Sequence, residues 1–201
     1  RSTIENRSDK PVQFRLRQYA VRDGRIRFRL PERTGTLAPG KTATLDNRSR
    51  WADPALWSPE HPELYELVSD LETEGRIVDR RRDRFGFREF WIHATDFYLN
   101  GKRIILQGDV GHADWNNAKL CDVAWPLYRQ DGINMLRIHD SSYWSAEFFR
   151  KCDERGMLAY AQMYPVLHRG RPNPEKFTSI EECSRIRCTS STSMPTAPGI
   201  V

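Results

Sequence analysis

The 201-residue sequence contains no uninterrupted apolar run of about 18 residues, which is the length that a membrane-spanning helix requires. Its first ten residues, RSTIENRSDK, also lack the apolar segment of a secretory signal peptide. The sequence therefore predicts no membrane partner and indicates no compartment. Because the chain begins with Arg1 in a strand-like stretch rather than with Met, we expect an upstream region to precede it.

Cysteine is scarce, with four residues in the chain. Cys121 and Cys152 lie in helix-like patterns, whereas Cys183 and Cys188 lie in a polar C-terminal stretch. None has a His or Cys partner at the spacing of a zinc site, and the four do not form the framework of a disulfide-rich domain. We therefore expect structural thiols, no metal site and no cofactor.

The chain has no excess of negative charge, because it contains 32 Lys and Arg residues and 27 Asp and Glu residues. Its net charge is +5 and its pI is near 9.2. The positive residues are spread through alternating patterns and mixed with acids, unlike the basic stripe of a nucleic-acid-binding protein. The densest run, DRRRDR at 79–84, falls between two strand-like segments. We interpret it as a solvated strand edge or a turn, and we predict no nucleic-acid partner.

What the sequence does contain is enough apolar side chain for packed cores, at 38% hydrophobic and 11% aromatic residues. From residue 1 to about 88 the apolar positions recur with a period of two, which is typical of half-buried strands. These positions include Val12, Phe14 and Leu16 and, after an Asp23-Gly24 turn, Ile26, Phe28 and Leu30. Further strand patterns follow at TATL (42–45), LYELVSDL (64–71) and GRIVDR (75–80). Short strands at this spacing predict an antiparallel sandwich of immunoglobulin-like size.

Beyond Phe90 short apolar runs alternate with helical periodicity. The runs RIILQ (103–107), NMLRI (134–138) and MLAYAQ (157–162) predict three strands. Between the first two, Leu120, Val123, Ala124, Leu127 and Tyr128 recur at helical spacing, with Pro126 as a kink or break. Between the last two, SAEFFRKCDERG predicts a helix that buries Phe148, Phe149 and Cys152 and ends at Gly156. This alternation predicts a parallel sheet.

Each of these three runs becomes polar at its C-terminal end. The polar residues are Gln107, Asp109, His112 and Asp114 after the first run, His139 and Asp140 after the second, and Gln162 and Tyr164 after the third. In parallel α/β sheets, and above all in (β/α)8 barrels, ligands bind at the C-terminal ends of the strands. We therefore expect a polar rim that binds a ligand.

Five stretches together resemble glycoside hydrolase family 2, which includes β-galactosidases, β-glucuronidases and β-mannosidases. They are LWSPEHPELYEL (56–67), FGFREFWI (85–92), FYLNGKRIILQGDVGHAD (97–114), DGINMLRIH (131–139) and FFRKCDERGML (148–158). Their order and spacing agree with the family from about residue 40 to 165.

The resemblance implies a multidomain β plus α/β fold. Residues 1–90 would form an immunoglobulin-like β-sandwich, and 91–172 the N-terminal part of a (β/α)8 barrel that stops early, since a full barrel takes about 250 residues. The Ser/Thr/Pro-rich stretch 173–201 does not resemble the family, and we expect a disordered or aberrant tail.

The resemblance also implies hydrolysis of β-glycosides with retention, by two glutamates that the family places on later barrel strands. Those strands lie beyond Val201, so we assign no catalytic residue and expect the chain to be an inactive fragment of a retaining β-glycosidase. The alternative is a non-catalytic sandwich module that binds a glycan or another domain. The sequence indicates neither the sugar nor the oligomeric state.

By the same resemblance, the sugar-contacting rim would include His112, Asp114, Arg137, His139 and Asp140. A planar Arg and a titratable His suit hydrogen bonding to sugar hydroxyls. A structural ion-pair network is the alternative for Arg137 and His139, and a structural role is likewise the alternative for His112. The chain departs from the family where Asp140 and Ser141 replace its usual Tyr-Pro, which leaves the substrate open.

Four more residues near the rim or the second helix have competing interpretations. Trp115 and Trp144 either stack on sugar faces or pack in the wall. Asp153 and Glu154 are adjacent in a helix and so point in different directions, which indicates a structural role rather than a catalytic pair.

Overall fold

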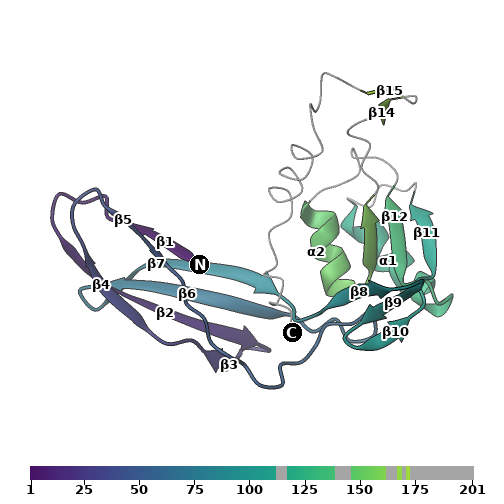
Figure 1. Cartoon of the computed structure of the whole chain (residues 1–201), viewed down its shortest axis with the longest axis horizontal. Coiled ribbons are helices and arrows are strands. Elements are labelled where there is room, and N and C mark those ends of the chain that lie inside the picture. The colour runs from purple at the N-terminus through teal and green to yellow at the C-terminus, as the bar shows by residue number, and fades with distance from the viewer. Residues whose placement is uncertain (112–116, 139–145, 162–166, 169–170, 173–201) are drawn as a thin grey trace. The chain divides into compact units, whose positions relative to one another are not determined.

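The computed structural model describes residues 1–111, 117–138, 146–161, 167–168 and 171–172. The chain folds into two compact units (Figure 1). The N-terminal unit comprises residues 1–55 and 64–85, and the C-terminal unit comprises 56–63 and the described residues from 86 onward. The three predicted domains stay a prediction, and the tail 173–201 lies outside the described residues.

The N-terminal unit consists of antiparallel strands, as the period-two pattern predicts. Its five-stranded sheet contains β3 (Arg25–Arg29), β2 (Val12–Arg22), β6 (Tyr65–Thr73) and β7 (Arg76–Phe85) in that order, with β4 (Arg33–Leu37) also paired to β2. A second sheet pairs β1 (Ser2–Glu5) with β5 (Thr42–Leu45). The unit is therefore mostly β and sandwich-like, which confirms the coarse fold prediction for this part of the chain.

Two-residue turns connect β2 to β3 and β6 to β7. Asp23 and Gly24 have φ angles of 52° and 70°, and Glu74 and Gly75 have 51° and 74°. Positive φ at both central residues matches the right-handed twist of the flanking strands and favours Asp-Gly over most other pairs. The predicted Asp23-Gly24 turn is thus confirmed.

The apolar core of this unit lies on one face of β2. Phe14 and Leu16 pack with Ile4 of β1 and Leu37 of β4. Gly35 faces Phe14 across the β2–β4 pair, and a Cβ at this position would lie 2.9 Å from the Phe14 ring. The ring can therefore cover the backbone only because residue 35 has no side chain.

The basic run DRRRDR lies inside β7. Among the described residues β7 pairs with β6 alone, so it forms the edge of the five-stranded sheet. The strand-edge interpretation of residues 79–84 is therefore correct, and the turn is wrong. Charge along an exposed edge disfavours pairing with another chain.

In the C-terminal unit a three-stranded antiparallel sheet stands where a parallel strand over 103–107 was predicted. Its strands are β8 (Phe90–His93), β9 (Asp96–Leu99) and β10 (Lys102–Ile104). Asn100 and Gly101, with φ of 52° and 78°, turn the chain so that Ile104 pairs with Phe97. Because of this turn, Arg103 and Ile104 of the apolar run RIILQ belong to the antiparallel strand β10. A continuous apolar run has no periodicity that would indicate where it is divided.

Three parallel strands follow in register. They are β11 (Gly108–Gly111), β12 (Met135–Ile138) and β13 (Leu158–Ala161), with α1 (Ala118–Gln130) and α2 (Ala146–Arg155) in the connections. A short antiparallel pair, β14 (Leu167–His168) and β15 (Arg171–Pro172), follows them. The described residues thus contain a small parallel α/β arrangement and no closed barrel.

The core of this unit lies between the helices and β12. Cys121 and Trp125 of α1 pack with Leu136 of β12 and with Phe148 and Cys152 of α2. The predicted helix and the burial of Phe148 and Cys152 are therefore confirmed, whereas Phe149 is only partly buried against this core. In α1, by contrast, Val123 is 67% exposed, although its spacing suggested a buried position.

Helix α1 continues through Pro126, so this residue does not end it. The side chain of Asn117 caps its first turn by accepting hydrogen bonds from the Lys119 and Leu120 amides. No helix within the described part of the chain is both long and apolar enough to cross a membrane.

Candidate functional site

The three parallel strands end side by side. Gly111 pairs with Ile138, and Ile138 pairs with Ala161, so the C-terminal ends of β11, β12 and β13 lie side by side at one end of the sheet, called here the strand-end edge (Figure 1). Ligands usually bind at this end of a parallel sheet.

Most of the predicted rim follows directly after these ends in the sequence. His112, Asp114, His139 and Asp140 lie outside the described residues, as do Trp115 and Trp144. Their assignment to a sugar-contacting rim stays a prediction.

Arg137 is the one residue of the predicted sugar-contacting set that the structure describes. Its neighbour Leu136 is buried in the core between the helices, and side chains alternate along a strand, so Arg137 projects from the opposite face of the sheet. The residues in register with it are Val110 on β11 and Tyr160 on β13, and Tyr160 is 54% exposed. A half-buried guanidinium next to an exposed aromatic ring, one residue before the strand ends, can donate hydrogen bonds to a polar ligand.

Asp109 does not belong to the strand-end edge, although the sequence pattern placed it there. It lies within β11, in register with Leu136, and its Oδ2 accepts a hydrogen bond of 2.9 Å from the Tyr128 hydroxyl of α1. Burial and this hydrogen bond raise the pKa of Tyr128. Asp109 therefore connects the sheet to a helix, because β11 begins at Gly108, five residues after the start of the predicted strand at 103.

Three of the five sequence stretches that carry the family resemblance meet at Trp57. Its indole Nε1 donates a hydrogen bond of 2.7 Å to the Asp153 carbonyl, and the guanidinium of Arg88 lies 4.4 Å from the centre of the Trp57 ring. Arg88 also forms an ion pair of 3.1 Å with the Asp153 carboxylate. These contacts agree with the structural interpretation of Asp153.

A second contact of the same kind joins Pro59 to the end of α2. Gly156 has φ of 72°, and a Cβ at this position would overlap the Pro59 carbonyl oxygen. Arg129 donates a hydrogen bond of 2.6 Å to that oxygen. Sequence reasoning missed both contacts, since the partners are far apart in the chain; the quoted stretches were their only signal.

The described ranges of the chain contain no cluster of side chains that could hold a metal ion. No group of three or more His, Cys, Asp or Glu side chains comes together there. Cys121 and Cys152 are buried, and burial raises the pKa of both thiols. Buried thiols of raised pKa are poor metal ligands and poor nucleophiles.

The sequence matches a known family over its N-terminal part. The model of glycosyl hydrolases family 2 matches residues 2–88. A putative beta-glucuronidase from Formosa agariphila is 36% identical over 121 residues, which cover 55% of this chain and 14% of the relative. A beta-galactosidase from Lactobacillus delbrueckii subsp. bulgaricus is 31% identical over 110 residues, covering 51% of this chain and 11% of the relative.

Solved structures of similar fold point to the same family. The beta-glucuronidase 2 of Bacteroides uniformis matches 86% of this chain with a TM-score of 0.67 and 22% identity, over 22% of its own length. A glycosyl hydrolase family 2 member from Bacteroides cellulosilyticus matches 78% with a TM-score of 0.62 and 27% identity, over 22% of its length. The chain therefore resembles glycoside hydrolase family 2 and spans a small part of its relatives.

Proposed function

We propose, from this resemblance to glycoside hydrolase family 2, that the chain is a segment of a retaining β-glycosidase that hydrolyses O-glycosyl bonds. Its N-terminal unit would be the immunoglobulin-like sandwich of the enzyme, and β11, β12 and β13 the first strands of a (β/α)8 barrel. The observation that carries the proposal is the register of these three parallel strands, which brings their C-terminal ends to one edge.

The proposed role of the edge is to hold the sugar. Arg137 projects from the face opposite the helices, which is the face that would line a barrel interior. There its guanidinium would donate hydrogen bonds to sugar hydroxyls or orient a neighbouring carboxylate. We propose the same role for His112, Asp114, His139 and Asp140, whose positions follow the ends of β11 and β12 in the sequence.

The chemistry itself would come from residues beyond this chain. Retention requires two carboxyl groups about 5 to 5.5 Å apart, one as nucleophile and one as general acid and then base. Binding groups without this pair do not cleave a glycoside. We therefore expect the 201-residue chain alone to leave aryl β-glucuronides and β-galactosides intact, and hydrolysis that His139→Ala abolishes would contradict the proposal.

The decisive experiment uses a longer protein, read from the gene past codon 201. We expect it to hydrolyse an aryl β-glucuronide or β-galactoside with retention of configuration, as followed by NMR of the first-formed product. Arg137→Gln should lower kcat/KM by about 10- to 100-fold, the effect of losing a charged hydrogen bond to substrate.

Arg103→Gln is the matched control, because this exposed arginine pairs with Asp96 on the hairpin, away from the strand ends. It should retain the wild-type kcat/KM. If Arg137→Gln and Arg103→Gln lower kcat/KM by the same factor, the role of Arg137 is merely structural. If the longer protein does not hydrolyse the glycoside with retention, the enzyme proposal is refuted.

A further inference from the structure

Asn100 is the only asparagine of the chain that a glycine follows. The pair forms the turn between β9 and β10, where Asn100 and Gly101 have φ angles of 52° and 78°. Gly101 is exposed, and a Cβ at this position would meet nothing within 4 Å. Asn-Gly is the dipeptide that deamidates most readily, because glycine has no side chain to hinder attack of its nitrogen on the asparagine side chain. The turn is therefore a candidate site of spontaneous modification.

Deamidation at this turn is an intramolecular substitution. The Gly101 backbone nitrogen attacks Cγ of Asn100, the Cγ–Nδ2 bond breaks, and ammonia leaves with the proton of the attacking nitrogen. Water then opens the cyclic imide at either carbonyl, which gives aspartate or isoaspartate. The reaction needs only water and a side chain that is able to turn its Cγ toward the Gly101 nitrogen.

In the folded chain the Asn100 side chain is held by two other segments. Its Nδ2 donates a hydrogen bond of 2.9 Å to the Trp57 carbonyl, and its Oδ1 accepts one of 3.1 Å from the Glu89 amide. The backbone amide of Asn100 also donates a hydrogen bond of 3.0 Å to the Glu89 carbonyl, which fixes the turn itself. Attack by the Gly101 nitrogen therefore requires the side-chain amide to leave these partners first.

The Trp57 carbonyl belongs to residues 56–63, which are part of the C-terminal unit although they precede β6 in the sequence. Trp57 is 1% exposed, and its backbone amide donates a hydrogen bond of 2.8 Å to the Phe87 carbonyl. The contacts of its indole with Arg88 and Asp153 hold the same residue. The acceptor of the Asn100 side chain is thus in place only while residues 56–63 stay packed in this unit.

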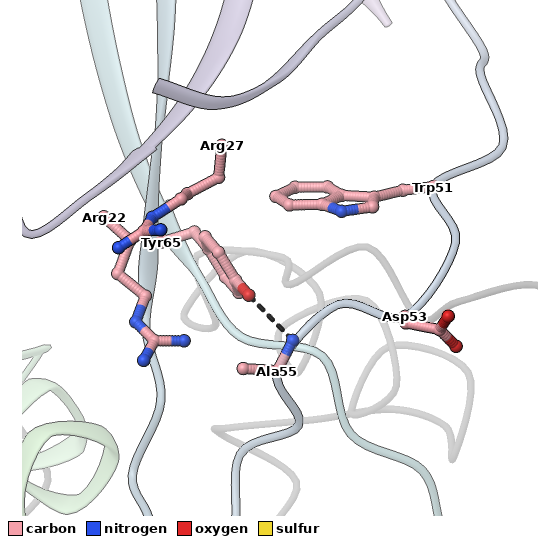
Figure 2. Close-up of a pocket in the computed structure, with 6 residues that line it drawn as sticks. All are labelled: Arg22, Arg27, Trp51, Asp53, Ala55 and Tyr65. Carbon is pink, nitrogen blue, oxygen red and sulfur yellow. Dashed lines mark hydrogen bonds between the residues drawn. The ribbon is translucent and has the colours of Figure 1, made fainter. Parts of the chain in front are cut away.

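Release of residues 56–63 does not require the N-terminal unit to unfold. The chain before this segment is fixed, because the Ala55 amide donates a hydrogen bond of 2.8 Å to the Tyr65 hydroxyl of β6 (Figure 2). Within the segment, the Ser58 amide donates a hydrogen bond of 2.8 Å to the His61 carbonyl, so this turn uses no partner outside it. A local opening of this kind is the event that would free the Asn100 side chain.

The product of deamidation cannot restore the same contact. An aspartate at residue 100 has an oxygen in place of Nδ2, and an ionised carboxylate donates no hydrogen bond. This oxygen would face the Trp57 carbonyl, which is also an acceptor, so an attraction becomes a repulsion. Isoaspartate in addition lengthens the backbone of the turn by one carbon. Either product therefore holds residues 56–63 less tightly than Asn100 does.

We propose that Asn100 is a deamidation site controlled by residues 56–63. The side-chain amide persists while Trp57 is packed, and it is converted once this segment is released. Because the product weakens the contact with Trp57, the conversion acts as a one-way latch that favours the released segment. The proposal goes beyond the proposed function, since it needs neither a sugar nor a catalytic carboxylate.

The test is the rate of deamidation of the 201-residue chain in mildly alkaline buffer, with and without urea. Trypsin releases residues 89–102 as one peptide, because Arg88 precedes it and Lys102 ends it. Mass spectrometry measures the conversion of this peptide against a sample digested at the start. We expect deamidation of Asn100 to be at least about tenfold slower in the folded chain than in urea, because local opening limits it.

Matched tryptophan variants assign the protection to residues 56–63. Trp57→Phe removes the indole hydrogen bond to Asp153 and should speed deamidation of the folded chain about threefold to tenfold. Trp91→Phe makes the same change at an exposed position of β8 and should alter the rate less than about twofold. In urea the variants and the wild type should react equally. If Trp57→Phe does not fold, Asp153→Asn, which removes the ion pair with Arg88, should speed the reaction at least about twofold.

A second pair of variants tests the latch. Asn100→Asp imitates the product and should speed hydrogen exchange in residues 56–63, measured by mass spectrometry. Asn117→Asp is the control, because the Asn117 side chain caps α1 by accepting hydrogen bonds, which a carboxylate does equally well. It should leave exchange in residues 56–63 unchanged.

Three results would overturn the proposal. Equal deamidation rates in the folded chain and in urea would show that the fold does not protect Asn100. Equal rates in Trp57→Phe and Trp91→Phe, or no acceleration in Asp153→Asn, would separate the protection from residues 56–63. Unchanged exchange in Asn100→Asp would remove the latch. None of these measurements involves glycoside hydrolysis, so a failure of the proposed function leaves their outcome unaffected.

Discussion

Asp70 organises the charged face of the N-terminal sheet. The residue is 3% exposed, although its side chain is ionisable. Its carboxylate accepts hydrogen bonds from Arg80 at 2.6 Å and 3.0 Å and from the Tyr19 hydroxyl at 3.2 Å. The Arg80 hydrogen bonds, helped by that of Tyr19, hold the pKa of Asp70 below its usual value of 3.8.

We predict that Asp70→Ala lowers the free energy of unfolding by about 1–3 kcal/mol at neutral pH, because it removes the buried acceptor of these hydrogen bonds. Urea denaturation followed by circular dichroism measures the change. Asp83→Ala is the control, since Asp83 pairs with the exposed Arg81 on the same edge strand, and it should cost less than about 0.5 kcal/mol.

The same residue predicts a pH dependence. Because the folded pKa of Asp70 lies below the unfolded value, its ionised form stabilises the folded state above about pH 4, and this contribution is lost as the pH falls through the lower folded pKa. The difference in stability between wild type and Asp70→Ala should therefore be constant above about pH 5 and shrink toward about pH 2. A difference that grows on acidification would contradict the assignment.

At the scale of elements, the end of α2 depends on one backbone contact. Gly156 combines a left-handed backbone with an approach to the Pro59 carbonyl that leaves no room for a Cβ. Gly101 in the β9–β10 turn has a similar φ of 78°, but a Cβ there would meet nothing within 4 Å. The two glycines therefore separate the effect of backbone conformation from that of steric overlap.

We predict that Gly101→Ala costs about 1 kcal/mol, which is the penalty of a left-handed conformation, and that Gly156→Ala costs about 3 kcal/mol or more. The melting temperatures of the two variants, measured by calorimetry, test the order. Equal destabilisation would mean that residues 56–63 move away from α2 at little cost.

At the scale of the whole molecule, the described residues form two hydrophobic clusters that have no residue in common. One surrounds Phe14 and Leu16 in the N-terminal unit, and the other surrounds Leu136 and Phe148 in the C-terminal unit. Separate cores usually give separately cooperative units of unfolding.

Hydrogen exchange measured by mass spectrometry should therefore respond unit by unit. Asp70→Ala should speed exchange in β2 and β6 and leave β12 unchanged, whereas Gly156→Ala should speed exchange in β12 and β13 and leave β2 unchanged. Acceleration of both units by either variant would show that the chain unfolds as one cooperative body.

Several features followed from the sequence alone because they depend on local periodicity. The alternation around Phe14 and Leu16 predicted β2, Asp23-Gly24 predicted the turn to β3, and the spacing of Phe148 and Cys152 predicted α2. The order of the apolar runs also predicted β12 and β13 in a parallel sheet. For β2, the turn and α2 the signal lies within about ten residues, which is the range over which backbone preferences act, whereas the parallel sheet followed from the alternation of runs along the chain.

Tertiary structure decided what local pattern does not encode. The run RIILQ was divided between a hairpin and a loop, and Val123 was left exposed although its spacing resembles that of a core residue. The contacts of Trp57 with Arg88 and Asp153, and its hydrogen bond with Asn100, join residues far apart in the chain. Such contacts depend on how whole elements pack against one another, and so the sequence determined the elements while their packing determined the surfaces that can bind a ligand.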